Sequence, residues 1–251
     1  MVISSNTLFH FTDNIDCLVS ILRHEFFPQV SLENHGDLFN PPSGEFEIGV
    51  PLVSFCDLPL SQIAEHLKFY GNYGIGLRKQ WGMEKGINPV MYLHSRSSFE
   101  ATLDKLILSV LRDKDEEKKQ LAMSIISFIK IYRGRIYRRG AYSVEKTFYD
   151  EKEWRFVPYP FVTGDKNNKT LLVKKDFFDP IKLGKINEIL KNKFKLSFEP
   201  EDIRYIIVER DEEILPMVKR IEEIKGPKYS YDVLKKLTTR VISSEQIKED
   251  F

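Results

Sequence analysis

The chain has 251 residues, of which 42% are hydrophobic and 12% aromatic, and its formal net charge is +1. This length and composition suit one domain with a substantial core, so we predict a single α+β domain over residues 1–251. The balanced charge gives no reason to expect charge-driven attachment to nucleic acid or to an anionic membrane, although nucleic acid is not ruled out as a partner.

Targeting signals and metal-ligand patterns are absent from the sequence. The N-terminus, MVISSNTLFHF, lacks a basic segment followed by an apolar run, so no signal peptide is expected. The apolar runs are too short for a transmembrane helix. Cys17 and Cys56 have no metal-ligand spacing around them, which indicates free thiols in a reducing compartment. We therefore predict a cytoplasmic protein with no membrane segment and no metal site.

The first part of the chain alternates irregularly between strand and helix patterns. Ile15, Leu18 and Leu22 have helical spacing after a first strand. We predict strands at 7–13, 50–59 and 88–95, a strand that runs into a short helical or turn segment at 73–81, and helices at 14–26 and 60–71. Residues 31–49 are polar and contain Gly and Pro, so we predict a long loop there, of the kind that is usually functional or mobile.

The hydrophobic period changes to a helical one near residue 97. Ser97 and Glu100 have the spacing of a capping box. Apolar residues then recur at helical spacing, first at Leu103, Leu106, Ile107, Val110 and Leu111, and later at Leu121, Ile125, Phe128, Ile129 and Tyr132. This pattern predicts a helical pair at 97–133, inserted between sheet-forming parts of the domain.

The second half is again mixed. After a basic connection at 133–146, we predict strands at 149–158, 169–176 and 201–210, and helices at 183–194, 212–225, 230–241 and 243–251. The C-terminal part is therefore helical. Because strands and helices do not alternate regularly, the order favours an α+β fold over a doubly wound parallel sheet.

The segment YDEKEWRFVPYP, residues 149–160, has more charges than an ordinary strand. Side chains alternate along a strand, which would place Glu151, Glu153 and Arg155 on one face and Trp154 and Phe156 on the other. Taken alone, the charges fit a solvent-exposed, salt-bridged face. A buried Trp154 would instead favour partly desolvated carboxylates, which can stabilise developing positive charge. Both interpretations stay open at this stage.

Two further strands contain candidate site residues. His10 and Thr12 would share one face of the first strand, and a histidine there is either structural or a hydrogen-bonding group at the mouth of a cleft. Ser54 would share a face with Cys56 on a middle strand. A single hydroxyl in a buried strand is common, so Ser54 is either an ordinary core position or part of a site.

The order of these features resembles that of a known superfamily. A histidine on the first strand, Ser-x-Cys on a middle strand and Glu-x-Glu on a later strand are similar to the ADP-ribosyltransferases, which bind NAD in a cleft between two small sheets. Nearly the whole chain also resembles the AbiGi-type proteins of bacterial abortive phage resistance, in the segments TLFHFTD, VSFCDLPLSQ, YGNYGIGLRKQWG, NPVMYL, EKEWRFVP and TTRVISSEQIKEDF. Members of that group have been described as the antitoxin half of a two-gene system.

The ADP-ribosyltransferase resemblance implies a split-sheet fold with NAD as the substrate. It implies that His10 and Thr12 orient the ribose or the nicotinamide amide of NAD. Ser54 would then lie near the nicotinamide, and Tyr70 or Tyr73 would stack on its ring.

The same resemblance implies roles for the charged strand. Glu153 would stabilise the oxocarbenium character that develops on the ribose, and Glu151 would orient or deprotonate the acceptor. Arg155 would hold both carboxylates ionised. The acceptor would be a macromolecule, or water if NAD is hydrolysed. Cys56 stands where a second hydroxyl is expected and His10 where an arginine is expected, so a site that binds without catalysis also fits.

Two other functions remain open, namely a non-catalytic regulator that binds a toxin partner and a nucleotide-sensing module. The enzyme hypothesis predicts that His10, Ser54 and Glu153 surround one pocket. The regulator hypothesis predicts an exposed apolar surface, with the helices of 97–133 as the candidate.

Overall fold

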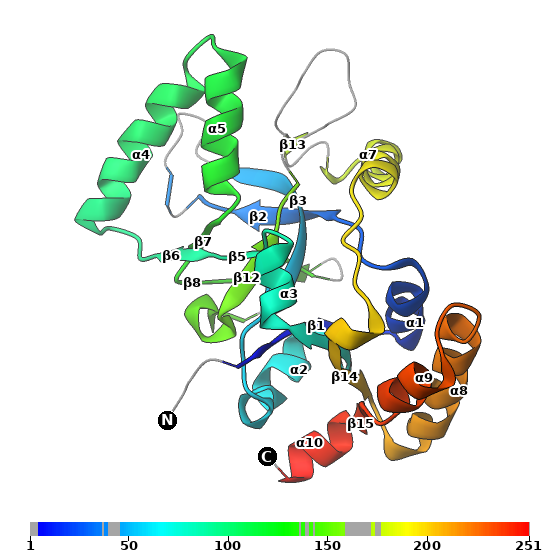
Figure 1. Cartoon of the computed structure of the whole chain (residues 1–251). Helices are drawn as coiled ribbons and strands as arrows, with labels where there is room; N and C mark the ends of the chain where they lie inside the picture. The colour runs from blue at the N-terminus through cyan, green and yellow to red at the C-terminus, as the bar shows by residue number, and fades with distance from the viewer. Residues whose placement is uncertain are drawn as a thin grey trace. The chain divides into compact units, whose positions relative to one another are not determined.

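The computed structural model describes residues 5–36, 38–39, 46–135, 137–138, 141–142, 144–158, 172–173 and 177–250 (Figure 1). The chain divides into two compact units. Unit 1 comprises Met1–Phe26, Ser54–Ile87 and Leu196–Phe251, and unit 2 comprises Phe27–Val53 and Asn88–Lys195. Each unit contains both strands and helices, so the predicted α+β class is confirmed.

Unit 1 is built on a mixed sheet with strand order β15-β14-β4-β1-β3. Its strands are β1 (Thr7–Thr12), β4 (Tyr73–Arg78), β14 (Ile203–Val208), β15 (Val241–Ser243) and the last three residues of β3 (Glu47–Cys56). The β14–β15 pair is parallel and the other pairs are antiparallel. In the β1–β4 register Phe9 lies opposite Gly76 and Thr12 opposite Tyr73.

Helices cover the strands of unit 1. They are α1 (Ile15–His24), α2 (Ala64–Tyr70), α3 (Lys79–Glu84), α8 (Ile214–Lys225), α9 (Tyr231–Thr238) and α10 (Ser244–Asp250). Helix α1 begins where the sequence predicted, because the Asn14 side chain accepts a hydrogen bond from the Asp16 N–H. Strand β1 is buried almost throughout, as expected for a strand with both faces covered. One core cluster contains Phe9, Phe11, Cys56, Leu58, Ile63, Leu67, Ile207 and Ile247.

Among the described residues of unit 2, strands β2 (Gln29–Asn34), β13 (Leu172–Val173), β12 (Glu153–Phe156) and β5 (Asn88–Pro89) belong to the sheet that contains β3, in the order β3-β12-β5 with β2 and β13 paired to β3, and the other strands form two-stranded sheets. The first 7 residues of β3 pair antiparallel with β2 and with β13. The other pairs are β5 with β12, β6 (Met91–Leu93) with β7 (Ile129–Ile131), β8 (Arg133–Gly134) with β11 (Lys146–Thr147), and β9 (Tyr137–Arg138) with β10 (Ala141–Tyr142). Helix α7 (Pro180–Lys193) confirms the helix predicted at 183–194.

The predicted helical pair is present as α4 (Ser98–Leu111) and α5 (Glu116–Ile126), which lie side by side (Figure 1). Ser97 caps α4 by accepting a hydrogen bond from the Glu100 N–H at 3.0 Å. Strands β6 and β7 flank the two helices in the chain and pair in parallel. Parallel neighbours need a long crossover connection, and α4 and α5 provide it.

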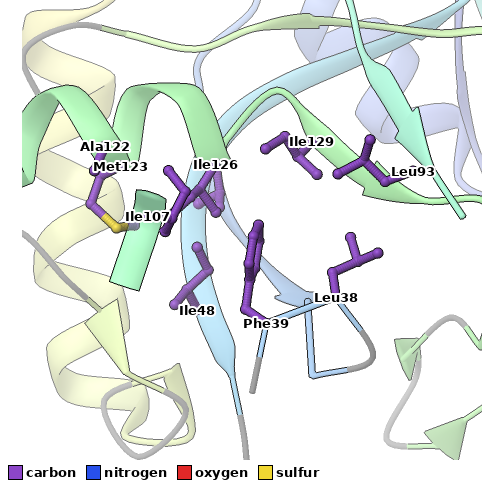
Figure 2. Packing of buried hydrophobic residues seen from close by; sticks show 10 residues of the cluster. Leu38, Phe39, Ile48, Leu93, Ile107, Ala122, Met123, Ile126 and Ile129 are labelled. Carbon is purple, nitrogen blue, oxygen red and sulfur yellow. The ribbon is translucent and has the colours of Figure 1, made fainter. Parts of the chain in front are cut away.

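The core of unit 2 forms where this helical pair meets β3 and β7 (Figure 2). Ile107 of α4 is buried, as are Met123 and Ile126 of α5. They pack with Ile48 and Ile129, which come from β3 and β7. Of the apolar stripe that predicted α4, Ile107 is buried and Leu103, Val110 and Leu111 pack partly against this core, whereas Leu106 is exposed.

Two predictions of local structure in unit 2 are wrong. The polar loop predicted over 31–49 contains most of β2 and the start of β3, since Asn34 pairs with Glu47 in the antiparallel register. Pairing stabilises these polar strands despite their low intrinsic propensity. The second helix ends at Ile126 rather than near 133, because Ile129–Ile131 pairs with β6 as β7.

The charged strand is also shorter than the predicted 149–158. Residues Phe148–Glu151 form a 3₁₀ turn, and Lys152 adopts a left-handed backbone with φ 45°. Strand β12 begins only at Glu153. Glu151 and Glu153 therefore do not occupy alternate positions of one strand, and strand alternation does not explain their proximity.

Other predictions fall partly outside the described residues. Of the strand predicted at 169–176, the structure describes Leu172–Val173, which forms β13. Within the described ranges, none of the helices is both long enough and apolar enough to cross a bilayer.

Candidate functional site

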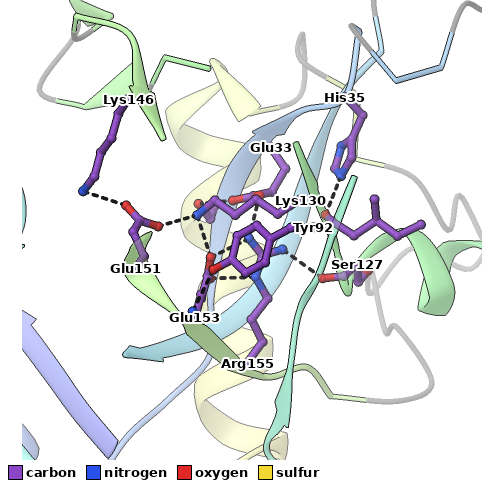
Figure 3. Close-up of polar contacts among 11 residues, drawn as sticks. Glu33, His35, Tyr92, Ser127, Lys130, Lys146, Glu151, Glu153 and Arg155 are labelled. Atoms are coloured by element: carbon purple, nitrogen blue, oxygen red, sulfur yellow. Dashed lines mark hydrogen bonds and ion pairs between the residues drawn. The ribbon is translucent and has the colours of Figure 1, made fainter. Parts of the chain in front are cut away.

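A buried arginine on β12 organises the polar interior of unit 2 (Figure 3). The Arg155 side chain is 0% exposed. Its Nε donates to Glu153 Oε1 at 2.6 Å, and its Nη2 donates to Glu33 Oε2 at 2.7 Å and to Glu153 Oε2 at 3.2 Å. Its Nη1 donates to the carbonyl of Ser127 at 2.9 Å, just after α5 ends. The guanidinium thus uses its fork of donors on two carboxylates and one helix end.

Two lysines complete the set of ion pairs. Lys130 Nζ lies 2.5 Å from Glu153 Oε2 and 3.0 Å from Glu151 Oε2. Lys146 Nζ lies 2.8 Å from Glu151 Oε1. Every carboxylate oxygen of Glu151 and Glu153 therefore has a cationic partner (Figure 3). We call this group of three carboxylates and three cations the charge cluster; it consists of Glu33, Lys130, Lys146, Glu151, Glu153 and Arg155.

Opposite charges in the cluster favour the ionised forms of Glu33 and Arg155. Burial by itself would raise the pKa of Glu33, but the positive charges of Arg155 and Lys130 outweigh it and hold that pKa below its usual range. Burial would likewise lower the pKa of Arg155, yet the charges of Glu153 and Glu33 raise it overall. At neutral pH the cluster is therefore a set of opposite charges that compensate one another.

Neutral side chains border the charge cluster. Tyr92 accepts a hydrogen bond from the Glu153 N–H at 2.8 Å, and burial raises the pKa of its hydroxyl. His35 Nε2 lies 3.1 Å from the carbonyl of Ile129, so this nitrogen donates, and burial lowers the pKa of its imidazole. Arg155 and His35 thus hold the carbonyls of Ser127, at the end of α5, and of Ile129, the first residue of β7.

The solvent-exposed interpretation of the charged segment is wrong. Glu151 is 3% exposed, Glu153 6% and Arg155 0%, whereas Trp154 and Phe156 are only half-buried. The charged face of β12 therefore points inward. This can occur because each buried charge meets an opposite charge at hydrogen-bonding distance.

Sequence reasoning missed four participants. Glu33 lies in the segment predicted as a loop, and Lys130 in the segment predicted as a helix. Lys146 and Tyr92 had no recognisable pattern. One sequence feature could have pointed to the charge cluster, namely Lys130 within SFIKIY. A lone lysine in an apolar run often has a buried partner of opposite charge.

Three candidate residues of unit 1 lie on or near the first and middle strands. His10 Nδ1 lies 2.8 Å from the carbonyl of Ser54, which can only accept, so Nδ1 is the donor. The His10 ring packs edge-on against Phe26 and Phe55. Thr12 Oγ1 accepts from the Asn14 N–H at 3.4 Å, next to the start of α1. The structure thus brings the His10 ring to the Ser54 backbone, whereas the register that pairs Phe9 with Cys56 puts the Ser54 side chain on the opposite face of the sheet from His10.

The two candidate tyrosines have different surroundings. Tyr73 is buried, and its hydroxyl lies 3.0 Å from Glu213 Oε1 and 3.3 Å from Glu209 Oε2. Burial and these carboxylates raise the pKa of Tyr73. Tyr70 stacks on His66 with ring centroids 4.3 Å apart and packs against the core of unit 1.

The candidate residues are divided between the two units. His10, Thr12, Ser54, Tyr70 and Tyr73 belong to unit 1, and Glu151 and Glu153 belong to unit 2. Across the described parts of the chain, no group of three or more His, Cys, Asp and Glu side chains is arranged to hold a metal ion.

Fold and site together define an α+β protein whose charged strand forms an internal ion-pair network. The model of the family described as "Putative abortive phage resistance protein AbiGi, antitoxin" matches residues 25–209. The chain is also 30% identical, over 240 residues, to the "Abortive phage resistance protein AbiGi" of Lactococcus lactis subsp. cremoris, and the match covers 84% of this chain and 92% of that relative. This chain therefore belongs to the AbiGi family of abortive phage resistance proteins.

Family membership confirms the predicted resemblance to AbiGi and places the chain in phage defence. The matched residues 25–209 include the whole charge cluster but not His10 or Thr12. No solved structure matches the chain.

Proposed function

We propose that this protein acts in phage defence as an antitoxin, a non-catalytic protein that binds and restrains a toxin partner. The observation that carries this proposal is the saturated charge cluster. A carboxylate that acts on a substrate needs an oxygen within reach of the reacting group. In Glu153, Oε1 accepts from Arg155, and Oε2 accepts from Lys130 and Arg155. The Glu-x-Glu segment therefore fits a structural role in unit 2 better than acid–base chemistry.

Two further observations support an antitoxin. The description of the matching family names an antitoxin. The regulator hypothesis also predicted exposed apolar side chains on the helical pair, and four are present there, namely Phe99, Leu106, Leu121 and Ile125. Large exposed apolar side chains grouped on two neighbouring helices are typical of protein-binding surfaces.

Co-expression with the product of the adjacent gene tests the antitoxin proposal. We expect that product to arrest growth when expressed alone, and growth to return when this chain is co-expressed. We also expect the two proteins to elute together after affinity capture of this chain.

One variant serves as a control for that experiment. The Lys68→Ala variant removes an exposed ion pair with Glu65 and should protect as well as the parent chain. The proposal fails if the adjacent product is harmless alone, or if its toxicity is unchanged by a folded, co-expressed chain.

We propose a second candidate function, NAD-dependent ADP-ribosyl transfer or NAD hydrolysis by an ADP-ribosyltransferase-like fold. Two contacts favour it. The ring of His10, which would orient NAD, donates to the backbone carbonyl of Ser54, which lies on the neighbouring strand β3. Glu151 and Glu153, which would act on the ribose and the acceptor, share Lys130 as a partner. In this proposal NAD is the substrate, and a macromolecule or water is the acceptor.

Nicotinamide release tests this second candidate. If it is right, the chain incubated with NAD should release nicotinamide, Glu153→Gln should reduce that release at least about 100-fold, and the exposed control Glu65→Gln should retain it. The enzymatic proposal is rejected if no nicotinamide is released. That result must hold both without an added acceptor and with nucleic acid, cellular protein or the product of the adjacent gene. Binding of NAD without turnover would favour the nucleotide-sensing alternative.

A further inference from the structure

Basic residues are concentrated in one segment of the sequence, although the chain as a whole is nearly neutral. Residues 118–144 contain no aspartate or glutamate, and their basic residues are Lys118, Lys119, Lys130, Arg133, Arg135, Arg138 and Arg139. Since these seven charges exceed the net charge of +1 for the whole chain, the other residues carry −6 in total. Such segregation of charge indicates a local anion-binding surface, which the net charge of the chain does not reveal.

Three segments of unit 2 meet beside the described part of this basic segment. Strands β6 and β7 are parallel, so the residues that follow them, His94 and Tyr132, lie at the same edge. The Tyr132 N–H donates to the carbonyl of Leu93 at 2.7 Å. The β8–β11 pair adds residues 146–149, and the Phe148 N–H donates to the carbonyl of Tyr132 at 2.8 Å. Segments that are distant in the chain therefore form one edge.

Aromatic rings are in contact along this edge. The ring centroids of Tyr132 and Tyr149 are 5.8 Å apart, and those of His94 and Tyr132 are 6.2 Å apart. Tyr149 is 53% exposed, and His94 is also exposed. Tyr92 supports Tyr149 with an edge-on contact at 5.4 Å, and the Tyr92 hydroxyl is itself held by the Glu153 N–H. An exposed ring is therefore presented on a fixed backing.

Two arginines are exposed at the same edge. Arg133 lies in β8 directly after Tyr132, and Arg135 directly follows β8. The lysines of the basic segment differ from them, because each of those lysines pairs with a carboxylate. Glu145 and Asp150 are exposed carboxylates in the adjoining segment, so phosphate contact here depends on the two guanidinium groups rather than on a uniformly positive surface.

We propose that this edge binds single-stranded nucleic acid. Its members, which we call the arginine–tyrosine edge, are His94, Tyr132, Arg133, Arg135 and Tyr149. A base stacks on the exposed Tyr149 ring, and the two arginines contact the phosphates beside it. Bases of a duplex are already stacked on one another, so an exposed ring selects a single strand. Every base has a face that can stack, so the binding tolerates different sequences.

Fluorescence anisotropy of the full chain with labelled single strands of about 12 nucleotides, oligo(dT) and oligo(U), tests the proposal. We expect a dissociation constant on the order of 10 μM at physiological salt. Two phosphate contacts on a single strand predict that this constant rises roughly 7-fold between about 50 and about 200 mM salt. A duplex of oligo(dA) and oligo(dT) should bind more weakly. Tighter binding of one single strand assigns the edge to DNA or to RNA, and either result supports the proposal.

Substitutions of tyrosine test the stacking. Tyr149→Ala should raise the dissociation constant about 5- to 100-fold, because it removes the ring on which a base stacks. Tyr149→Phe keeps the ring and should bind like the parent chain. Tyr231→Ala is the matched control, since Tyr231 is 69% exposed on α9 in unit 1 and lies outside the edge. Circular dichroism establishes that the variants fold.

Substitutions of arginine test the phosphate contacts. Combining Arg133→Ala with Arg135→Ala should weaken binding and remove most of its salt dependence. Combining Arg23→Ala with Arg204→Ala is the charge-matched control, because both of these arginines are exposed in unit 1, and this variant should bind like the parent chain.

The proposal is overturned if neither single strand binds, if the duplex binds as tightly, or if Tyr149→Ala binds like the parent chain. It does not rest on the antitoxin function. If the parent chain binds no oligonucleotide and Tyr149→Ala abolishes capture of the adjacent gene's product, the edge belongs to that protein partner. The antitoxin function then stands, and nucleic-acid binding does not.

Discussion

Replacing Arg155 by methionine is expected to lower the free energy of unfolding by about 3 to 5 kcal/mol. The substitution keeps most of the side-chain volume but removes the charge that Glu33 and Glu153 face. Both carboxylates would lose buried partners, and the carbonyl of Ser127 would lose its donor. Removing one partner of a buried ion pair costs far more than the pair itself contributes, because the remaining charge stays desolvated.

Urea unfolding followed by far-ultraviolet circular dichroism measures this loss. The Lys68→Ala variant removes an exposed ion pair and should leave the midpoint nearly unchanged. Combining Arg155→Met with Glu153→Gln should recover part of the loss, because one of the unpaired carboxylates is then removed as well. If Arg155→Met shifts the midpoint no more than Lys68→Ala does, the charge cluster does not support unit 2.

Replacing Gly71 by alanine is expected to cost about 2 to 5 kcal/mol. Gly71 ends α2 with φ 104° and ψ 169°, a conformation that only glycine adopts readily. A Cβ at this position would lie 2.3 Å from the carbonyl oxygen of Thr12 and 2.4 Å from Asp13 Cα. Both of those atoms are backbone, so neither can move aside. The close approach also sets where Tyr73 enters β4 opposite Thr12.

Gly86 is the matched control for this substitution. It too has a positive φ, 73°, but nothing lies within 4 Å of a Cβ built there. Gly86→Ala should therefore cost only the left-handed backbone term, about 1 to 2 kcal/mol. Thermal unfolding of both variants compares the two losses. Equal losses would mean that contact with Thr12 and Asp13 adds nothing to the cost at Gly71.

The charge cluster changes what the Glu-x-Glu segment implies about function. The segment belongs to the part of the chain that matches the AbiGi family, and each of its carboxylate oxygens has a cationic partner. Matches along most of the chain identify the family, while the contacts favour a structural role for Glu151 and Glu153. The NAD-dependent proposal requires Glu151 or Glu153 to leave an ion pair in order to reach a substrate, and the antitoxin proposal does not. Measuring nicotinamide release separates the two proposals.

Local sequence signals determined the class of the fold and many of its helices. Ser97 caps α4 as predicted and Asn14 caps α1, since a capping side chain acts on backbone groups only two or three residues away. The helical period identified α4 together with its packing face. These features depend on neighbours along the chain, so the sequence alone contains them.

Tertiary structure decided the rest. Alternation can assign two residues to one face of a strand, but it does not say whether that face is turned inward. Arg155 is buried because Glu33, 122 residues away in the chain, reaches its guanidinium, and Glu153 is buried because Lys130, 23 residues away, reaches its carboxylate. The polar strand β2 likewise exists through pairing with β3. A buried charge is stable only beside its partner, and folding, not local sequence, brings the partners together.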